Sequence, residues 1–241
     1  MRPLHRRRIR AIVRKELRGY RRNGSIVAAM AVIPLVFLVQ PLVAVLTVSS
    51  ASAVQIKDHH ELLYMLAIPA LVPVMLASYA IVGERQEGTL EPVLSTPIPR
   101  EELLLGKALA VLAPGVALAY VVFVVFIVLV GLFAHPGIPS ALIRAPDVIA
   151  QVIFTPLIAT WSIWIGIAIS TRVSDIRVAQ QLSVLASLPT VALTTMLALD
   201  VIHPTLRLAV GLGIALLVAN RLGWRLVSAM FDRERLITGI K

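Results

Sequence analysis

Long stretches without charged residues divide this sequence, and they constrain the fold more than any other feature. Six stretches lack Asp, Glu, Lys and Arg, namely 23–56, 62–83, 108–143, 148–171, 178–199 and 208–220. A helix that crosses a bilayer needs about 20 consecutive apolar residues. The first five stretches are each long enough to cross, so the pattern indicates a chain that passes through a membrane several times.

The composition agrees with this interpretation. Of the 241 residues, 58% are hydrophobic and 15% are charged, whereas an ordinary soluble domain is roughly 45–50% apolar and about 25% charged. A soluble fold of this length cannot bury so much apolar surface. The stretches are apolar on all sides, which excludes alternating barrel strands. We therefore predict an all-α polytopic membrane protein with spans at about 26–48, 62–82, 110–132, 149–170, 181–199 and 205–223.

The sixth span rests on weaker evidence than the others. Its uncharged stretch has only 13 residues, which is short for a hydrocarbon core of about 30 Å. The segment spans if Arg207 and Arg221 extend their side chains outward and Trp224 lies at the interface. A re-entrant or interfacial segment is the alternative.

Positive charge is concentrated on one side of the predicted spans. With six spans, 20 of the 23 Lys and Arg residues fall on the side of the two termini, and only Lys57, Arg144 and Arg207 fall on the other. The positive-inside rule then places both termini in the cytoplasm of a multi-pass protein in the cell (plasma) membrane. The same asymmetry accounts for the net charge of +10 without nucleic acid.

The segments outside the spans are short, so we treat residues 1–241 as a single transmembrane domain. Residues 1–24 place Ile9, Ile12, Val13, Leu17 and Tyr20 at helical spacing among Arg and Lys, which predicts a basic amphipathic elbow helix at the inner interface. A topology signal alone is the alternative. Residues 83–107 form a cytoplasmic loop that we expect to contain a short coupling helix, and residues 224–241 form a cytoplasmic tail.

No catalytic or metal-binding constellation is recognisable in the sequence. Gly106 and Lys107 lack the earlier glycine of a phosphate-binding loop and are followed by Ala108. The chain has no Cys, and the run from Asp58 to Glu61 is best explained as a solvated loop. We therefore predict no ATPase site, no metal and no cofactor in this chain.

Small residues recur four positions apart in two of the spans. One stripe is Ser162, Gly166 and Ser170, and the other includes Ala209, Gly211, Gly213, Ala215 and Ala219. Such stripes let helices approach closely. Packing within the chain is the expected use, and a dimer contact is the alternative.

The loop after the second span carries an acidic cluster on an otherwise basic face. It contains five of the 13 acidic residues, Glu84, Glu87, Glu91, Glu101 and Glu102. The first three would share one helical face if Gly88 does not break the turn, and their mutual repulsion would then require a cationic partner. If Gly88 does break it, Thr89 can cap a second helix that includes Glu91.

This loop resembles the corresponding loop in the membrane (permease) subunits of type-2 ATP-binding-cassette transporters. The family pattern reads roughly E-R-E-x-G-T-L-E-x-L-L-x-T-P, followed by E and then G-K. The matching residues are Glu84, Arg85, Gly88, Thr89, Leu90, Glu91, Leu94, Thr96, Pro97, Glu101 or Glu102, Gly106 and Lys107. Gln86 departs from the pattern, and the ending from Phe231 to Thr238 also resembles the family's tail.

The resemblance implies a permease subunit of an ATP-driven exporter. Such permeases form the pathway as a homodimer or a related heterodimer and bind two ABC ATPase subunits, which hold ATP and Mg. It further implies a coupling helix over 84–96, with ATPase-coupling residues Glu84, Arg85, Glu87, Gly88, Thr89, Leu90, Glu91, Thr96 and Pro97. The alternative is a non-transporting membrane assembly or sensing module that couples to the same kind of ATPase.

Overall fold

The computed structural model of the chain describes residues 5–22, 24–47, 60–89 and 98–230. Within these ranges the regular elements are all helices, which confirms the all-α prediction. They are α1 (Arg6–Arg22), α2 (Gly24–Thr47), α4 (Glu61–Tyr64), α5 (Ala67–Gln86), α7 (Arg100–Phe133), α8 (Ile138–Leu142), α9 (Ala145–Arg172), α10 (Ile176–Ala198) and α11 (Leu206–Met230).

Six helical segments of the described chain are long and apolar enough to cross a membrane, as predicted. The second consists of α4 and α5 together, from Glu61 to Gln86. The sixth is α11, a continuous helix of 25 residues. At 1.5 Å per residue this length exceeds a hydrocarbon core of about 30 Å, so the structure favours a full span over a re-entrant segment.

The helices around the acidic loop are longer than their apolar stretches. α5 continues to Gln86 and α7 begins at Arg100, so both helices extend into the predicted loop 83–107. The charged ends suit the helix dipole, because Glu101 lies in the first turn of α7 and Arg85 in the last turn of α5. A search for uncharged stretches misses such polar extensions.

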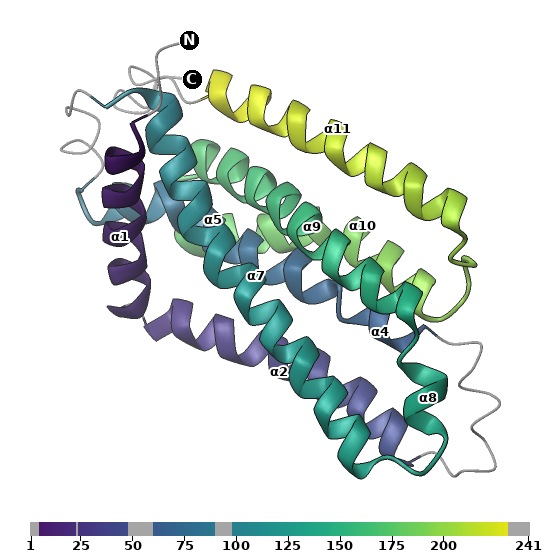
Figure 1. Cartoon of the computed structure of the whole chain (residues 1–241). Helices are drawn as coiled ribbons and strands as arrows, with labels where there is room; N and C mark the ends of the chain where they lie inside the picture. The colour runs from purple at the N-terminus through teal and green to yellow at the C-terminus, as the bar shows by residue number, and fades with distance from the viewer. Residues whose placement is uncertain (1–4, 23, 48–59, 90–97, 231–241) are drawn as a thin grey trace.

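Figure 1 shows the long helices running side by side, with α1 lying across one end of the bundle. We call this the terminal end, since it also contains the last turns of α5 and α11 and the first turn of α7. The opposite end, which contains α4 and α8, is the distal end. α5 is the central helix, because 15 of its 20 residues are buried.

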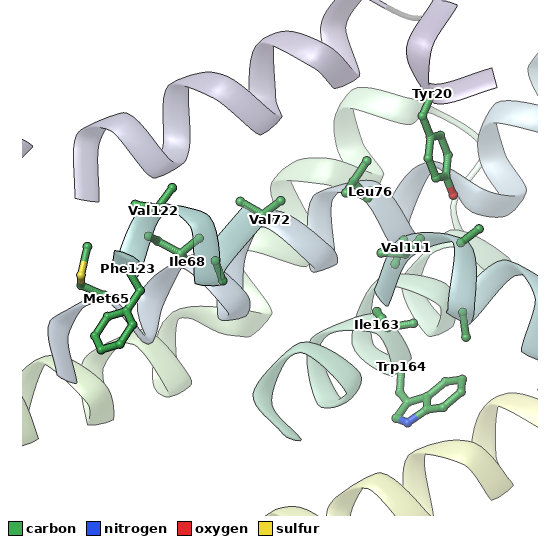
Figure 2. Packing of buried hydrophobic residues seen from close by; sticks show 14 of the residues in the cluster. Tyr20, Met65, Ile68, Val72, Leu76, Val111, Val122, Phe123, Ile163 and Trp164 are labelled. Carbon is green, nitrogen blue, oxygen red and sulfur yellow. The ribbon is translucent and has the colours of Figure 1, made fainter. Parts of the chain in front are cut away.

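One apolar cluster runs along most of the bundle. Figure 2 shows it extending from Met65 and Phe123 at one end to Tyr20 and Trp164 at the other. A smaller cluster joins Leu66 of the α4–α5 turn to Ile158 of α9 and Leu197 of α10. The two clusters hold α5 in place along its length.

The first small-residue stripe packs within the chain, as expected. A Cβ added at Gly166 would lie 2.7 Å from the Val74 carbonyl oxygen and 2.7 Å from the Ala77 Cβ of α5. One turn later, the Ser170 hydroxyl accepts hydrogen bonds from the Ile81 and Val82 amides at 3.0 Å each. The stripe therefore sets how closely α9 approaches α5.

The second stripe is largely open along α11. A Cβ added at Gly211 or Gly213 would meet nothing within 4 Å. α11 is instead anchored near its end, where Trp224 packs edge-on against Trp164 with ring centroids 5.5 Å apart. Asn220 donates to the Leu157 carbonyl oxygen at 3.0 Å. These two contacts attach the later half of α11 to α9, and Leu208, Leu212 and Leu216 of its earlier half pack against the smaller apolar cluster.

We expect Gly166→Ala to destabilise the fold by about 1–3 kcal/mol, the usual cost of overpacking. The added methyl group meets backbone atoms of α5, which cannot turn away as a flexible side chain can. Gly131→Ala is the matched control, because a Cβ there meets nothing within 4 Å. Thermal unfolding in detergent measures both variants. Equal melting temperatures would show that α5 and α9 are not in close contact.

Candidate functional site

The predicted coupling residues fall partly inside the described chain. Glu84, Arg85, Glu87, Gly88 and Thr89 are described, and they form the end of α5 and the turn that follows it. The other predicted residues, Leu90, Glu91, Thr96 and Pro97, lie outside the described residues.

Gly88 ends α5 with a glycine cap. Its φ of 68° lies in the left-handed region that favours glycine. The Thr89 amide donates to the Glu84 carbonyl oxygen at 2.9 Å, and the Gly88 amide donates to the Arg85 carbonyl oxygen at 3.3 Å. These two bonds make a Schellman motif. Gly88 therefore breaks the turn, and the helix that carries Glu84 and Glu87 does not continue toward residue 91.

Glu84 is buried within the chain, with 6% of its surface exposed. Its two oxygens pair with different lysines: one with Lys15 of α1 and the other with Lys107 of α7, at 2.8 Å. The sequence argument required a cationic partner for this acidic face without saying which protein supplies it. The structure supplies the cations for Glu84 from this chain.

Lys107 is the centre of this group, which we call the buried ion cluster: Lys15, Glu16, Glu84 and Lys107. The Lys107 ammonium is fully buried. Its three acceptors are a Glu84 oxygen, a Glu16 oxygen at 3.1 Å and the Ala80 carbonyl oxygen at 2.8 Å. They match the three N–H donors of a lysine. Two lysines and two glutamates make the cluster electrically balanced.

A close backbone approach brings α1 to this position. A Cβ added at Gly106 would lie 2.6 Å from Cγ2 of Ile12, so the glycine beside Lys107 makes room for α1. A further contact joins α1 to the first turn of α7. Glu102, with 1% exposed, accepts from the His5 amide at 2.9 Å and lies 3.7 Å from Arg8.

The end of α5 is also attached to the connection between α9 and α10. Arg85 donates to the Val173 carbonyl oxygen, and Gln86 donates to the Ser174 carbonyl oxygen, both at 3.2 Å. Asp175 then caps α10, because its side chain accepts from the Arg177 amide at 2.8 Å and the next amide at 3.0 Å. The turn 87–89 therefore lies on a platform made from α1, α5, α7 and the α9–α10 connection.

Within the turn, the side chains face outward. Glu87, Gly88 and Thr89 are exposed, and Glu87 accepts a hydrogen bond from the Tyr79 hydroxyl. A groove of about 360 Å³ lies on α1, lined by Arg10, Val13, Arg14, Leu17, Arg18 and Arg21. These arginines have no acidic partner within the described ranges. The terminal end thus presents one acidic turn and one basic helix face.

Sequence reasoning missed the role of Glu16. It is the only acidic residue among the first 83, apart from Asp58 and Glu61. It lies four residues from both Ile12 and Tyr20, and these three residues are the buried face of α1. That spacing was the available signal for a buried carboxylate, since an acid on the apolar face of a basic helix requires a partner.

The carboxylates of the buried ion cluster affect the pKa of Lys15 and that of the nearby Tyr20. Burial lowers the pKa of Lys15, but its hydrogen bond to Glu84 and the charges of Glu16 and Glu84 outweigh burial and raise the pKa. Burial raises the pKa of Tyr20 well above its usual range, and the same two carboxylates raise it further. Lys15 is therefore charged and Tyr20 neutral at neutral pH.

The fold is that of a multi-pass α-helical membrane protein whose terminal end carries a structured turn between two spans. The family model described as ABC-2 family transporter protein matches residues 10–231. The chain therefore belongs to the ABC-2 transporter family, whose members are permease subunits with the ATPase on a separate protein. No curated protein matches the chain significantly.

We expect Lys107→Met to destabilise the fold by about 3–5 kcal/mol, because it leaves two buried carboxylates without their central cation. Lys15→Met is the matched comparison. Its side chain is half exposed, so solvent screening makes the loss smaller. Thermal unfolding of the two purified variants measures the difference. Equal losses would contradict the central role of Lys107.

We expect Tyr20→Phe to raise stability by about 1 kcal/mol, because the buried Tyr20 hydroxyl has no hydrogen-bond partner among the described residues. The raised pKa adds a pH dependence. The tyrosine contribution is constant below pH about 10, where the unfolded side chain titrates, and stability is lost as the pH rises toward the folded pKa. The variant should therefore lose less stability between pH 9 and 11, measured by urea unfolding. An unchanged alkaline loss would contradict this assignment.

Proposed function

We propose that the chain is the permease half of an ATP-driven exporter, in which two permeases form the pathway and two ABC ATPase subunits bind at the terminal end. Both termini then lie in the cytoplasm, and ATP and Mg bind to the ATPase. The observation that carries the proposal is the exposed turn Glu87–Thr89, held on a platform of four elements in a chain of the ABC-2 family.

The contacts around the turn support a coupling role. A displacement of residues 87–89 acts directly on α5. It reaches α1 and α7 through the buried ion cluster, and it reaches the α9–α10 connection through Arg85 and Gln86. Packed elements with matched polar contacts move together, because separating them would leave buried charges unpaired. Leu90, Glu91, Thr96 and Pro97 join the proposed ATPase contact through the resemblance.

The burial of Glu84 changes the part that we assign to it. If Glu84 touched the ATPase, as the resemblance implies, Glu84→Lys would weaken ATPase binding and leave the fold intact. Because Glu84 lies between Lys15 and Lys107, the change would instead place a third ammonium group in the buried ion cluster and destabilise the fold. In the proposal, Glu84 and Arg85 support the turn from behind, and Glu87 and Glu91 face the ATPase.

We expect Glu87→Lys to weaken copurification of the ATPase by about 10-fold or more, because reversing an interfacial charge costs at least about 1.4 kcal/mol. Glu87→Gln should have a smaller effect, since it removes the charge without creating repulsion. Both variants should melt within about 2 °C of the unchanged protein. A pull-down of the partner ATPase measures binding, and transport assays in vesicles measure coupling.

The outcomes separate the proposal from its alternatives. ATPase binding and transport lost together in Glu87→Lys, with normal melting, support coupling through this turn. Full binding by a Glu87→Lys, Glu91→Lys double variant would show that the turn is not the ATPase contact. ATPase binding without transport of any solute by the unchanged complex would favour an assembly or sensing module.

A further inference from the structure

A stripe of buried polar residues follows one face of α9 at the distal end. Asp147, Gln151 and Thr155 are spaced four residues apart, which places them on one helical face. Asp147 is 4% exposed, and the other two are fully buried. Polar side chains are rarely buried in a membrane bundle without partners. This stripe belongs to neither the buried ion cluster nor the proposed ATPase contact.

Most of the polar atoms in the stripe lack hydrogen bonds to the described protein. Both polar atoms of the Gln151 amide, the Thr155 hydroxyl and the Asp147 Oδ2 atom have no hydrogen-bond partner. Leaving such atoms unsatisfied costs about 1–3 kcal/mol each. Native proteins satisfy groups of this kind with protein atoms or with ordered water.

Contacts at both ends of the stripe determine what it faces. At its outer end, the His60 ring lies 2.8 Å from Asp147. At its inner end, Ile158 shares an apolar cluster with Leu66. Gln151 and Thr155 lie between these points, so they face α4 and the α4–α5 turn. There the backbone bonds shorten to three-residue spacing, from Met65 to Leu62 and from Leu66 to Leu63.

A broken helix at this depth agrees with a polar site. Irregular backbone within a membrane span is tolerated where it is buried in protein or lines a water-filled cavity. Pro69 follows the turn and lacks an amide proton, so the Met65 carbonyl oxygen accepts from the Ile68 amide instead, at 3.1 Å. The unpartnered side chains of α9 are therefore opposite the one interrupted segment between Glu61 and Gln86.

The spacing of the stripe fits water. Residues four apart on a helix are separated by about 6 Å along its axis, which is about twice a hydrogen-bond length. One water between Asp147 and Gln151, and another between Gln151 and Thr155, would satisfy the unpartnered atoms. We propose that the distal stripe of α9 is a water-binding site, a short file of ordered water that enters beside His60 and ends at Ile158.

The charges favour a neutral ligand. Arg144 lies 3.8 Å from Asp147 and offsets its charge. Across the described residues, no group of three His, Asp, Glu or Cys side chains could hold a metal ion. Gln151 and Thr155 each donate and accept hydrogen bonds, as water requires. The apolar side chains of Ile158 and Ala159, both buried, close the inner end.

The chain has no cysteine, so a single introduced thiol can report on water. Gln151→Cys, Thr155→Cys and Ile158→Cys would be treated with silver nitrate in the intact protein, then denatured and labelled with maleimide. Silver ions reach a thiol through water. The site predicts that the thiols at 151 and 155 are blocked at least about 10-fold faster than the thiol at 158, which lies one turn deeper on the same helix. Equal slow rates at all three positions would overturn the proposal.

A second measurement is needed because replacing a larger side chain with cysteine could itself create space for water. Thr155→Val keeps the shape of the side chain and removes the hydroxyl. If water binds there, the variant loses a hydrogen bond and should melt about 2–4 °C lower. If the stripe is dry, the variant removes an unsatisfied buried group and should melt higher, which would contradict the site. Neither measurement involves the ATPase, so both are independent of the proposed coupling.

Discussion

The arrangement of the terminal end depends on one buried ammonium group. Lys107 is fully enclosed, and its charge requires the three acceptors that α1 and α5 provide. An isolated charge in this position would be strongly unfavourable. The pairing therefore determines the position of three elements that are far apart in the sequence. The pairing of Lys107 with Glu84 also positions the turn 87–89, because Glu84 lies one helical turn before it.

Particular residues show how far the sequence predicts this structure. Hydropathy identified all six spans, because crossing a membrane requires length and apolarity and little else. It did not place the ends of α5 and α7, where Gln86 and Arg100 continue the helix beyond the apolar stretch. Nor did it reveal that Glu84 is covered by this chain, because the partners Lys15 and Lys107 come from helices whose packing a linear pattern does not specify.

Buried polar groups have different surroundings at the two ends of the bundle. At the terminal end, Lys107 and Glu16 find charged partners within the protein. At the distal end, Gln151 and Thr155 find none among the described residues. The difference follows from the helix contacts: Ser170 and Gly166 bring α9 close to an unbroken part of α5, whereas Gln151 and Thr155 face the interrupted segment. The terminal end, where we propose that the ATPase binds, is therefore the more closely packed of the two ends.

The contact between α1 and α7 has a consequence for biosynthesis. Glu16 and Lys107 are 91 positions apart in the chain, so α1 leaves the ribosome long before its partner exists. During that interval the carboxylate of Glu16 remains in water or among lipid headgroups. The contact between Glu16 and Lys107 can form only after the third span has been synthesised. Until then, α1 and α7 cannot pack against each other. Chains that stop before Lys107 would leave Glu16 and Glu84 without their shared cation, with only the half-exposed Lys15 beside them.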